Sequence, residues 1–312
     1  MLSVRRAARV TFSIGMTGMG INPVILKSKN PRILVIGGTG RLGGLIRRAV
    51  GDGGGVGVRL IWQARTEGRG GDLVFDPLGQ PDAYARAARA ADVVLNLAGV
   101  VAGDAQALGA NTELALAALR AAETAGGRPV LVASSAAVYG PRPGAQAETD
   151  ALAPAGAYGA AKHAMEQALQ GAAGICCLRI GNVAGADALL GVPHAPGTRV
   201  LDIFPDGTAP RRSYIGPHAI AHAIARLARL AAGGAALPAA LNLAQAGPVG
   251  MDALLRAAGE SWRDRPAPEG AIAEITLDVA RAVTLGLVSE EPARAADIVA
   301  DLASLPPAET RA

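Results

Sequence analysis

The chain is poor in cysteine, aromatic residues and lysine. Its two cysteines, Cys176 and Cys177, are neighbours and cannot join distant segments, so a disulfide-framed secreted domain is excluded and a reducing, cytoplasmic compartment is expected. The two Trp, four Tyr and three Phe residues are too few for a surface that stacks RNA bases. The apolar stretch between Val10 and Leu26 is too short and too polar to span a bilayer, so we expect no membrane span.

Acidic residues are absent from the first part of the chain. Residues 1–51 contain nine of the 30 Lys and Arg residues and none of the 26 Asp and Glu residues, so the remaining 261 residues carry 21 basic and 26 acidic groups. The body of the protein is therefore mildly acidic, which argues against a nucleic-acid partner although the whole chain has a net charge of +4. We interpret residues 1–30 as an N-terminal extension, either disordered or transit-like.

From residue 31 the pattern alternates between short apolar runs and segments with helical spacing. The predicted strands are Arg32–Ile36, Val58–Ile61, Leu73–Phe75, Val93–Leu97, Val130–Val132 and Ile175–Ile180. The predicted helices between them are Leu42–Val50, Pro81–Ala90, Asn111–Ala125 with Asn111 as N-cap, and Tyr158–Leu169. Runs that are apolar throughout indicate strands buried on both faces, and their alternation with helices predicts a parallel α/β sheet.

After Asn182 the alternation is lost, and five prolines interrupt the next 35 residues. We predict helices at Ala219–Ala231, Met251–Ala258 and Ala293–Leu302 in this part. The expected division is a dinucleotide-binding domain at 31–182 and a mostly substrate-binding lobe at 183–312, interleaved with the last elements of the sheet. His218 and His222 lie four residues apart without a third ligand at recognisable spacing, so no metal site is expected.

Three groups of residues could carry chemistry. The first predicted strand leads into the turn Gly37-Gly-Thr-Gly40-Arg-Leu-Gly43, which opens a helix and suits a pyrophosphate at the helix N-terminus. Tyr158 and Lys162 are spaced to lie on one helix face, where the ammonium would lower the tyrosine pKa and suit it to proton transfer. Lys162 is the only lysine after residue 29, in a chain that otherwise uses arginine.

A serine follows the fifth predicted strand. The carboxyl ends of parallel strands face the ligand crevice, which places Ser134 and Ser135 near the same region. No histidine lies nearby in sequence and the G-x-S-x-G elbow is absent, so a hydrogen-bonding serine is favoured over a nucleophile.

Together these motifs resemble the extended short-chain dehydrogenase/reductase superfamily, of the NAD-dependent epimerase/dehydratase type. The resemblance covers roughly residues 32–245, and its further segments are Val93–Gly99, Asn111–Gly126, Ser134–Gly140, Glu148–Tyr158 and Leu178–Gly185. It implies a Rossmann-like doubly wound parallel sheet with a small C-terminal substrate lobe. It also implies that Tyr158 shuttles a proton, Lys162 binds the nicotinamide ribose and Ser135 orients the reacting oxygen.

The resemblance further implies which positions bind ligands. The expected cofactor-binding residues are Gly37, Gly40, Arg41, Leu42, Gly43, Arg65, Asp76, Leu97, Ala98, Gly99, Tyr158, Lys162 and Val183. The expected substrate contacts are Ser135, Asn182 and Arg212. Arg65 follows the second predicted strand, where an acidic residue would favour NAD, so NADP is favoured over NAD. Asp76 is read either as an adenine contact or as an ordinary turn residue before Pro77.

The expected function is that of an NAD(P)-dependent oxidoreductase or epimerase, acting at a carbonyl or secondary alcohol of a sugar or nucleotide-sugar. Two departures weigh against a large nucleotide-sugar: the acidic pair that follows Arg212 in related sequences is missing, and the C-terminal part is short. An NADPH-dependent ketone or aldehyde reductase is an alternative, and a non-catalytic NAD(P)-sensing protein is an alternative of another class. A small-molecule substrate is expected, with a homodimer as a possible assembly.

Overall fold

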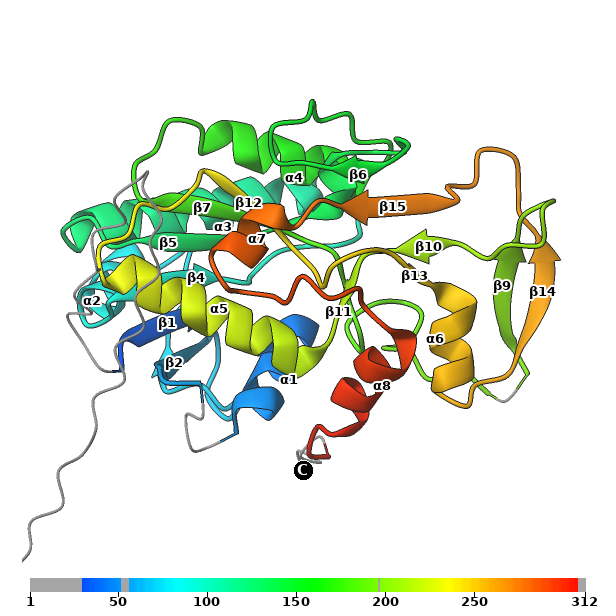
Figure 1. Cartoon of the computed structure of the whole chain (residues 1–312). Coiled ribbons are helices and arrows are strands. Elements are labelled where there is room, and N and C mark those ends of the chain that lie inside the picture. The colour runs from blue at the N-terminus through cyan, green and yellow to red at the C-terminus, as the bar shows by residue number, and fades with distance from the viewer. Residues whose placement is uncertain (1–29, 52–55, 196, 308–312) are drawn as a thin grey trace, which may run out of the picture.

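A seven-stranded sheet forms the centre of the molecule (Figure 1). The computed structural model describes residues 30–51, 56–195 and 197–307, so the predicted N-terminal extension lies outside the described residues apart from its last position. All neighbouring strands of the sheet are parallel. Their order is β12 (Ala240–Leu243), β7 (Ile175–Ile180), β5 (Val130–Ser135), β4 (Val93–Asn96), β1 (Arg32–Ile36), β2 (Arg59–Ala64) and β3 (Leu73–Val74). This confirms the predicted Rossmann-like α/β fold.

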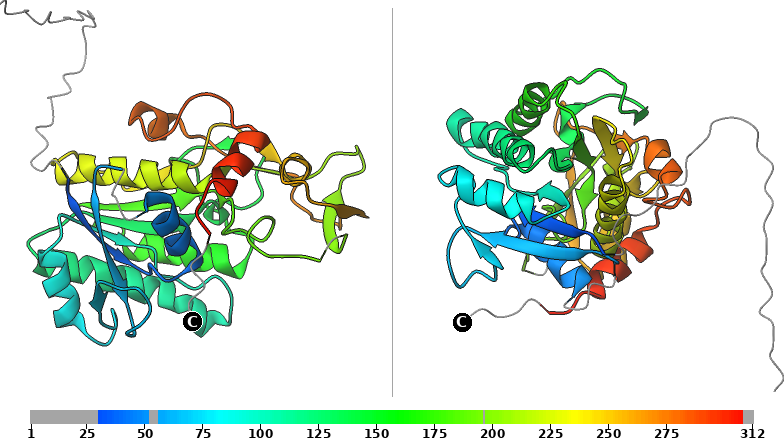
Figure 2. Two further views of the ribbon diagram at one scale, coloured as in Figure 1. Left: turned by 90° about the horizontal axis from the view of Figure 1, so that it is seen from below. Right: turned by 90° about the vertical axis from the view of Figure 1, so that its left-hand side faces the viewer.

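The strands form where the apolar runs are because helices cover both faces of the sheet. Leu34 on one face and Val35 on the other are both fully buried. One face packs against α1 (Arg41–Val50) and α5 (Pro217–Ala232), and the opposite face packs against α2 (Pro81–Arg89), α3 (Ala105–Thr124) and α4 (Ala157–Ala168). Figure 2 shows the two helical layers on either side of the sheet.

The strand order reverses between β1 and β4. From β1 the chain proceeds outward through β2 and β3, and it then returns to β4 and proceeds in the other direction. Ligands of open α/β sheets bind at such a switch point, beyond the carboxyl ends of the strands. Gly37 follows β1 and Leu97 follows β4, so both segments border this crevice.

Two details of the predicted elements are corrected by the structure. Helix α3 begins six residues before the predicted N-cap: the carboxylate of Asp104 accepts from Ala107 N at 2.8 Å and caps the helix, while Asn111 is buried within it. The strand β12 and the short helix α7 (Ala280–Thr284) have no counterpart among the predicted elements. Each has five residues or fewer, which is too short for a periodicity to stand out.

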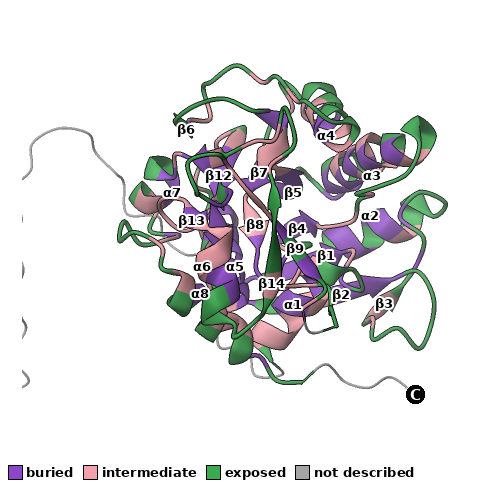
Figure 3. Cartoon of the chain, turned by 90° about the vertical axis from the view of Figure 1, so that its right-hand side faces the viewer, coloured by how far each residue is buried: buried purple, intermediate pink, exposed green. Residues whose placement is uncertain are grey.

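The strand β6 and most residues after β7, apart from α5 and β12, build a thinner region beside the sheet. It contains a four-stranded sheet, two two-stranded ribbons and the helices α6 (Met251–Ala257) and α8 (Ala295–Ala303). The four-stranded sheet has the order β13 (Val249–Gly250), β10 (Arg211–Arg212), β15 (Glu274–Leu277) and β6 (Ala145–Gln146), and the ribbons pair β8 (Asn182–Val183) with β11 (Tyr214–Ile215) and β9 (Arg199–Ile203) with β14 (Trp262–Pro266). In this ribbon four of the five residues of β14 are exposed, whereas β9 exposes only Val200 and buries Arg199 and Leu201 (Figure 3). The domain division at residue 182 stays a prediction.

The C-terminal helix α8 caps the helix α5. The carboxylate of Asp301 accepts from the backbone N–H of His218 at 2.9 Å and of Ala219 at 3.2 Å, and it also contacts His218 Nδ1 at 2.8 Å. His218 is therefore engaged in a contact between helices. Over the described residues, no cluster of three or more His, Cys, Asp or Glu side chains could hold a metal ion. Over the same residues, no helix has the length and apolar character needed to cross a bilayer.

Candidate active site

The glycine turn after β1 brings backbone N–H groups to the crevice. Gly37 has a positive φ of 81°, and Gly40 N donates to Gly37 O at 3.0 Å, which closes the turn. Gly40 is the N-cap of α1 and supplies no side chain, so the first N–H groups of this helix are available to an external acceptor. Such a helix N-terminus favours a negatively charged group through its exposed donors and its dipole.

The three glycines of the predicted motif have different surroundings. A Cβ on Gly37 would lie 2.5 Å from Ala98 N, and one on Gly43 would lie 2.6 Å from Gly38 Cα, so both positions need glycine for packing. A Cβ on Gly40 would meet only Gly37 O, at 3.3 Å, within 4 Å. The second glycine is therefore the least crowded of the three, and the absence of a side chain there allows a pyrophosphate to approach the backbone closely. The space around these three glycines therefore fits the pyrophosphate of a dinucleotide.

Across the crevice, Asn111 shapes the segment after β4. Its amide exchanges two hydrogen bonds with the backbone of Val100, accepting from the N–H at 3.2 Å and donating to the carbonyl at 2.9 Å. A Cβ on Gly99 would lie 2.6 Å from Asn111 Oδ1 and 3.2 Å from Lys162 Nζ, so this glycine lets the lysine pass. Sequence reasoning missed this role, although a buried asparagine inside a helix is a usable signal, because its amide must be satisfied.

Ser135 ends β5 at the edge of the same crevice. Its hydroxyl oxygen accepts from Ala137 N at 3.2 Å and starts a short 3-10 turn, η1 (Ala136–Val138). The hydroxyl also lies near enough to Tyr158 to act on the pKa of its phenol, which it lowers. The structure thus brings together the serine and tyrosine that the motifs singled out.

Tyr158 and Lys162 lie one turn apart on α4, as their spacing predicts. The Lys162 side chain passes beneath Gly99 and donates from Nζ to Ala133 O at 2.8 Å. Only 4% of this residue is exposed. Burial lowers the pKa of Lys162 to about 8, against an opposing influence from Cys177 and Glu166. The lysine is therefore held rigidly in position.

The expected effect of Lys162 on Tyr158 is not found. Burial raises the pKa of Tyr158 above its usual value, and the influences that lower it come from the Ser135 hydrogen bond and the charge of Arg41. The reason is geometric, because Lys162 Nζ is directed to the carbonyl of Ala133. The tyrosine thus starts as a protonated phenol.

These groups line one cavity of about 500 Å³. Besides Ser135, Tyr158 and Lys162, its walls include the following predicted positions: Gly37, Gly40, Arg41, Leu42, Gly43, Leu97, Gly99, Asn182 and Val183. Asp187 also lines the cavity and was not predicted. Its carboxylate accepts from Tyr214 OH at 2.7 Å and from Leu190 N at 3.0 Å. Burial and the neighbouring Asp187 raise the pKa of Tyr214.

The cavity continues into two further hollows along the glycine turn. A hollow of about 300 Å³ shares Gly37, Gly40 and Leu97 with the cavity and adds Ala98, Arg65 and Asp76. A second, of about 480 Å³, is lined by Thr39, Thr66, Arg69 and again by Arg65 and Asp76. The three hollows form one groove from Tyr158 to Arg65, which suits an elongated ligand. Arg69 was missed because it lies in a glycine-rich loop without periodicity.

Asp76 serves the turn that follows β3 as well as lining the groove. Its carboxylate accepts from Leu78 N at 3.3 Å and from Gly79 N at 3.1 Å. The reading as a turn residue thus describes its present contacts, and its place in the groove keeps the adenine contact as a prediction.

Arg212 is the predicted site residue that the structure does not bring to the cavity. Its guanidinium donates to three backbone carbonyls, those of Arg211 at 2.7 Å, Ala273 at 3.1 Å and Ile272 at 2.8 Å. Burial lowers the pKa of Arg212. The side chain ties β10 to the segment before β15 and is absent from the cavity lining.

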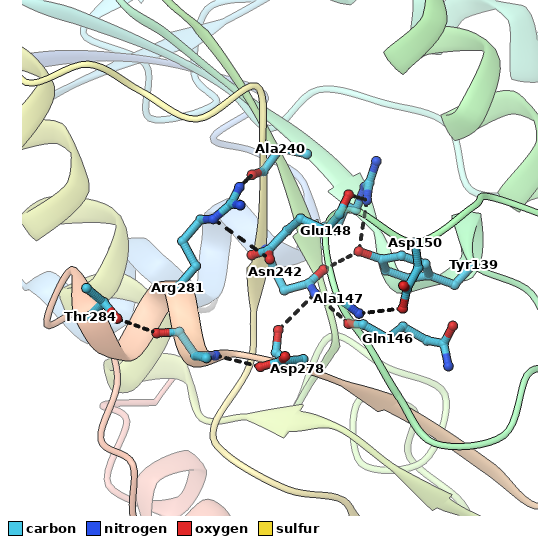
Figure 4. Close-up of polar contacts among 12 residues, drawn as sticks. Tyr139, Gln146, Ala147, Glu148, Asp150, Ala240, Asn242, Asp278, Arg281 and Thr284 are labelled. Carbon is cyan, nitrogen blue, oxygen red and sulfur yellow. Dashed lines mark hydrogen bonds and ion pairs between the residues drawn. The ribbon is translucent and has the colours of Figure 1, made fainter.

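A buried polar network joins the elements that carry the site, and Figure 4 shows the part of it around Tyr139 and Asn242. The Tyr139 hydroxyl donates to Asn242 Oδ1 at 2.7 Å and accepts from Arg179 Nη1 at 2.8 Å. Arg179 pairs with Glu166 of α4 at 2.8 Å, and Ser134 Oγ donates to the same carboxylate at 2.5 Å. The network joins β5, β7, β12 and the helix that carries Tyr158, so it fixes their relative positions.

The fold and groove agree with the family to which the chain belongs. Residues 33–203 match the model of the NAD dependent epimerase/dehydratase family, and this is more than half of the chain. The protein is a member of that family. Comparison with curated proteins gives no match.

Solved structures share the fold at low sequence identity. A UDP-glucose 4-epimerase from Stenotrophomonas maltophila, solved with NAD and formylated UDP-arabinopyranose, is 24% identical with a TM-score of 0.70; the match covers 88% of this chain and 97% of that one. A UDP-glucose 4-epimerase from Brucella ovis, in complex with NAD, is 21% identical with a TM-score of 0.70, over 86% and 96% of the two chains. A short-chain dehydrogenase/reductase superfamily protein from Agrobacterium tumefaciens with bound NAD is 20% identical with a TM-score of 0.67, over 88% and 96%.

Proposed function

We propose that the protein is an NAD(P)-dependent oxidoreductase or epimerase that acts on a carbonyl group or secondary alcohol, such as that of a sugar. The observation that carries the proposal is the convergence of Ser135, Tyr158 and Lys162 at one end of a groove that begins at the glycine turn. A groove alone would suit many ligands. A phenol and a hydroxyl that line the same end of the groove supply a proton donor and an orienting group for a reacting oxygen.

The residues of the groove fit a dinucleotide cofactor. The N–H groups at the start of α1 would hold its pyrophosphate, Lys162 would hold the nicotinamide ribose, and Val183 would contact the nicotinamide end. A bound nicotinamide supplies the acceptor or donor of the hydride. A cytoplasmic location agrees with two buried free thiols, Cys176 and Cys177.

Tyr158 is the residue that we assign to proton transfer. Its raised pKa keeps the phenol protonated at neutral pH, so it can donate to a carbonyl oxygen as an alkoxide develops. Ser135 Oγ is fixed by the amide of Ala137 and would orient the same oxygen. The positive charge of Arg41 favours the phenolate that remains after transfer.

The test uses Tyr158→Phe with a matched control. Tyr84→Phe also removes one phenolic hydroxyl, from a buried tyrosine whose oxygen has no hydrogen-bond partner among the described residues. Both variants are screened with carbonyl compounds, alcohols and sugars, following NAD(P)H absorbance and epimer formation. We expect Tyr158→Phe to bind NADPH normally and lose turnover by about 100-fold or more, while Tyr84→Phe keeps both. Undiminished turnover in Tyr158→Phe would refute the assignment.

The cofactor preference is assigned to Arg65. Arg65 and Arg69 line the far hollow together, where two guanidinium groups favour a 2′-phosphate. We expect NADPH to bind more tightly than NADH by about 1–3 kcal/mol, and Arg65→Ala to weaken NADPH alone. Fluorescence titrations with both cofactors at two salt concentrations measure this, since the preference should shrink as salt increases. Equal affinities, or tighter NADH, would show that Arg65 has another role.

The same screen separates the alternatives. Net oxidation of added NADPH would indicate a ketone or aldehyde reductase, whereas epimer formation without net cofactor turnover would indicate an epimerase. A non-catalytic NAD(P)-sensing protein would bind the cofactor without using the tyrosine and lysine, so the Ser135–Tyr158 contact speaks against it.

A further inference from the structure

The charged side chains of the catalytic cavity are unevenly placed. Among the described residues that line it, three carry a charge: Arg41, Lys162 and Asp187. Arg41 belongs to the glycine turn, beside the N–H groups at the start of α1. Lys162 is held by the carbonyl of Ala133. Both cations are therefore committed to the cofactor side of the cavity, and Asp187 is the charged group left for a substrate.

Asp187 is built into the cavity wall. The backbone N–H of Leu190, in the loop after β8, donates to one carboxylate oxygen of Asp187. The hydroxyl of Tyr214 on β11 donates to the other oxygen. Asn182 pairs with Tyr214 across β8 and β11 and lines the same cavity as Asp187, so the amide and the carboxylate belong to one polar wall. Each oxygen of Asp187 accepts one hydrogen bond and has a second lone pair for a donor.

Four arginines of the smaller region already have partners in this structure. Arg212 donates to the carbonyls of residues 211, 272 and 273. Three others pair with carboxylates at 2.6 to 3.7 Å: Arg199 with Glu260, Arg211 with Glu274, and Arg265 with Asp202. The cavity lining includes the Asp187 carboxylate and no arginine of the smaller region, so a diphosphate that reached Asp187 would find no cation of that region in the wall. Juxtaposing like charges in a partly buried site costs affinity.

We infer that Asp187 selects a small, phosphate-free substrate that carries hydroxyl or ammonium donors near its reacting carbon, and that it excludes nucleotide diphosphates. This rests on the proposed function, because it takes the cavity beside Tyr158 as the substrate site. It also separates this chain from the UDP-sugar ligands of the similar solved structures, whose fold it shares.

The first experiment measures binding and does not depend on finding a substrate. UDP and UDP-glucose are titrated by calorimetry into the NADP-saturated parent protein, Asp187→Asn and Asp206→Asn. Asp206 is the control, because it is an exposed carboxylate of the same region that bonds only within its own turn, to Thr208. Asp187→Asn keeps the shape of the side chain and an acceptor for Tyr214, and its melting temperature is compared with that of the parent.

We expect the parent and Asp206→Asn to bind UDP-glucose no more tightly than about 1 mM. Removing the charge in Asp187→Asn should tighten binding by about tenfold. Parent binding below about 0.1 mM, or an Asp187→Asn variant that binds like Asp206→Asn, would overturn the inference. The parent titration decides the matter even if the variant is unstable.

The second experiment compares matched pairs in the activity screen: glyceraldehyde with glyceraldehyde 3-phosphate, and glucose with UDP-glucose. Turnover of the phosphate-free members supports the inference, and preference for a phosphorylated member overturns it. Failure of both NADPH and NADH to bind would instead refute the proposed function, and the UDP titration would then be made on the cofactor-free protein.

Discussion

The parallel sheet and the region after β7 use charge and burial in opposite ways. In β1 four of five residues are buried, whereas in β14 four of five are exposed. The Arg179–Glu166 pair within the sheet has side chains 7% and 9% exposed, while the Arg265–Asp202 pair between β14 and β9 has side chains 60% and 25% exposed. The proposed catalytic residues Ser135, Tyr158 and Lys162 thus belong to the sheet and the helix that covers it, whereas Asp187 follows β8 in the smaller region.

The largest difference is expected on breaking the two ion pairs. Arg179→Ala would leave the Glu166 carboxylate buried without its cation and remove a donor to Tyr139. Such an uncompensated buried charge lowers the free energy of unfolding by about 3–5 kcal/mol. Urea unfolding of the parent and the variant measures the loss. A change of less than about 1 kcal/mol would mean that the buried and exposed pairs are equivalent.

A pH dependence of similar size is expected from Lys162. Its pKa of about 8 in the folded protein lies below the ordinary value of 10.5, which the unfolded chain retains. Between these two pH values the unfolded state binds a proton that the folded state has released, so the free energy of unfolding increases with pH. The gain relative to Lys162→Met should reach about 3 kcal/mol at most. Urea unfolding at several pH values measures this gain. If the free energy of unfolding of the parent and of Lys162→Met changed equally with pH, the prediction would be wrong.

The smallest effect is expected in the exposed ribbon. Arg265→Ala removes the contact with Asp202, and it should lower the free energy of unfolding by no more than about 1 kcal/mol, because solvent screens the pair. It should also leave NADPH binding unchanged. The same urea assay as for Arg179→Ala measures this, and a loss of several kcal/mol would show that the ribbon supports the sheet.

Sequence reasoning succeeds where one residue type has one physical use. The glycine turn was predictable because only glycine fits at Gly37 and Gly43, and the sheet was predictable because strands buried on both faces read as apolar runs. The spacing of Tyr158 and Lys162 was predictive because a helix turns every 3.6 residues. These features are local, and each is encoded within a few residues.

The remaining features depend on contacts between distant segments. Asn111 reads as a helix cap in sequence because asparagine is common there, and its amide instead bonds the loop at Val100. Asp187 is one aspartate among many until the fold places Tyr214 beside it. The direction of Lys162, toward Ala133 O, depends on where β5 passes below α4. None of these follows from a pattern of neighbouring residues.

The contact between Asp301 and α5 sets an order of events during synthesis. His218 and Asp301 are 83 residues apart in the chain, so α5 leaves the ribosome well before the carboxylate that caps it has been translated. Until α8 has been made and docked, the N-terminal N–H groups of His218 and Ala219 in α5 lack the carboxylate that accepts from them in the folded protein.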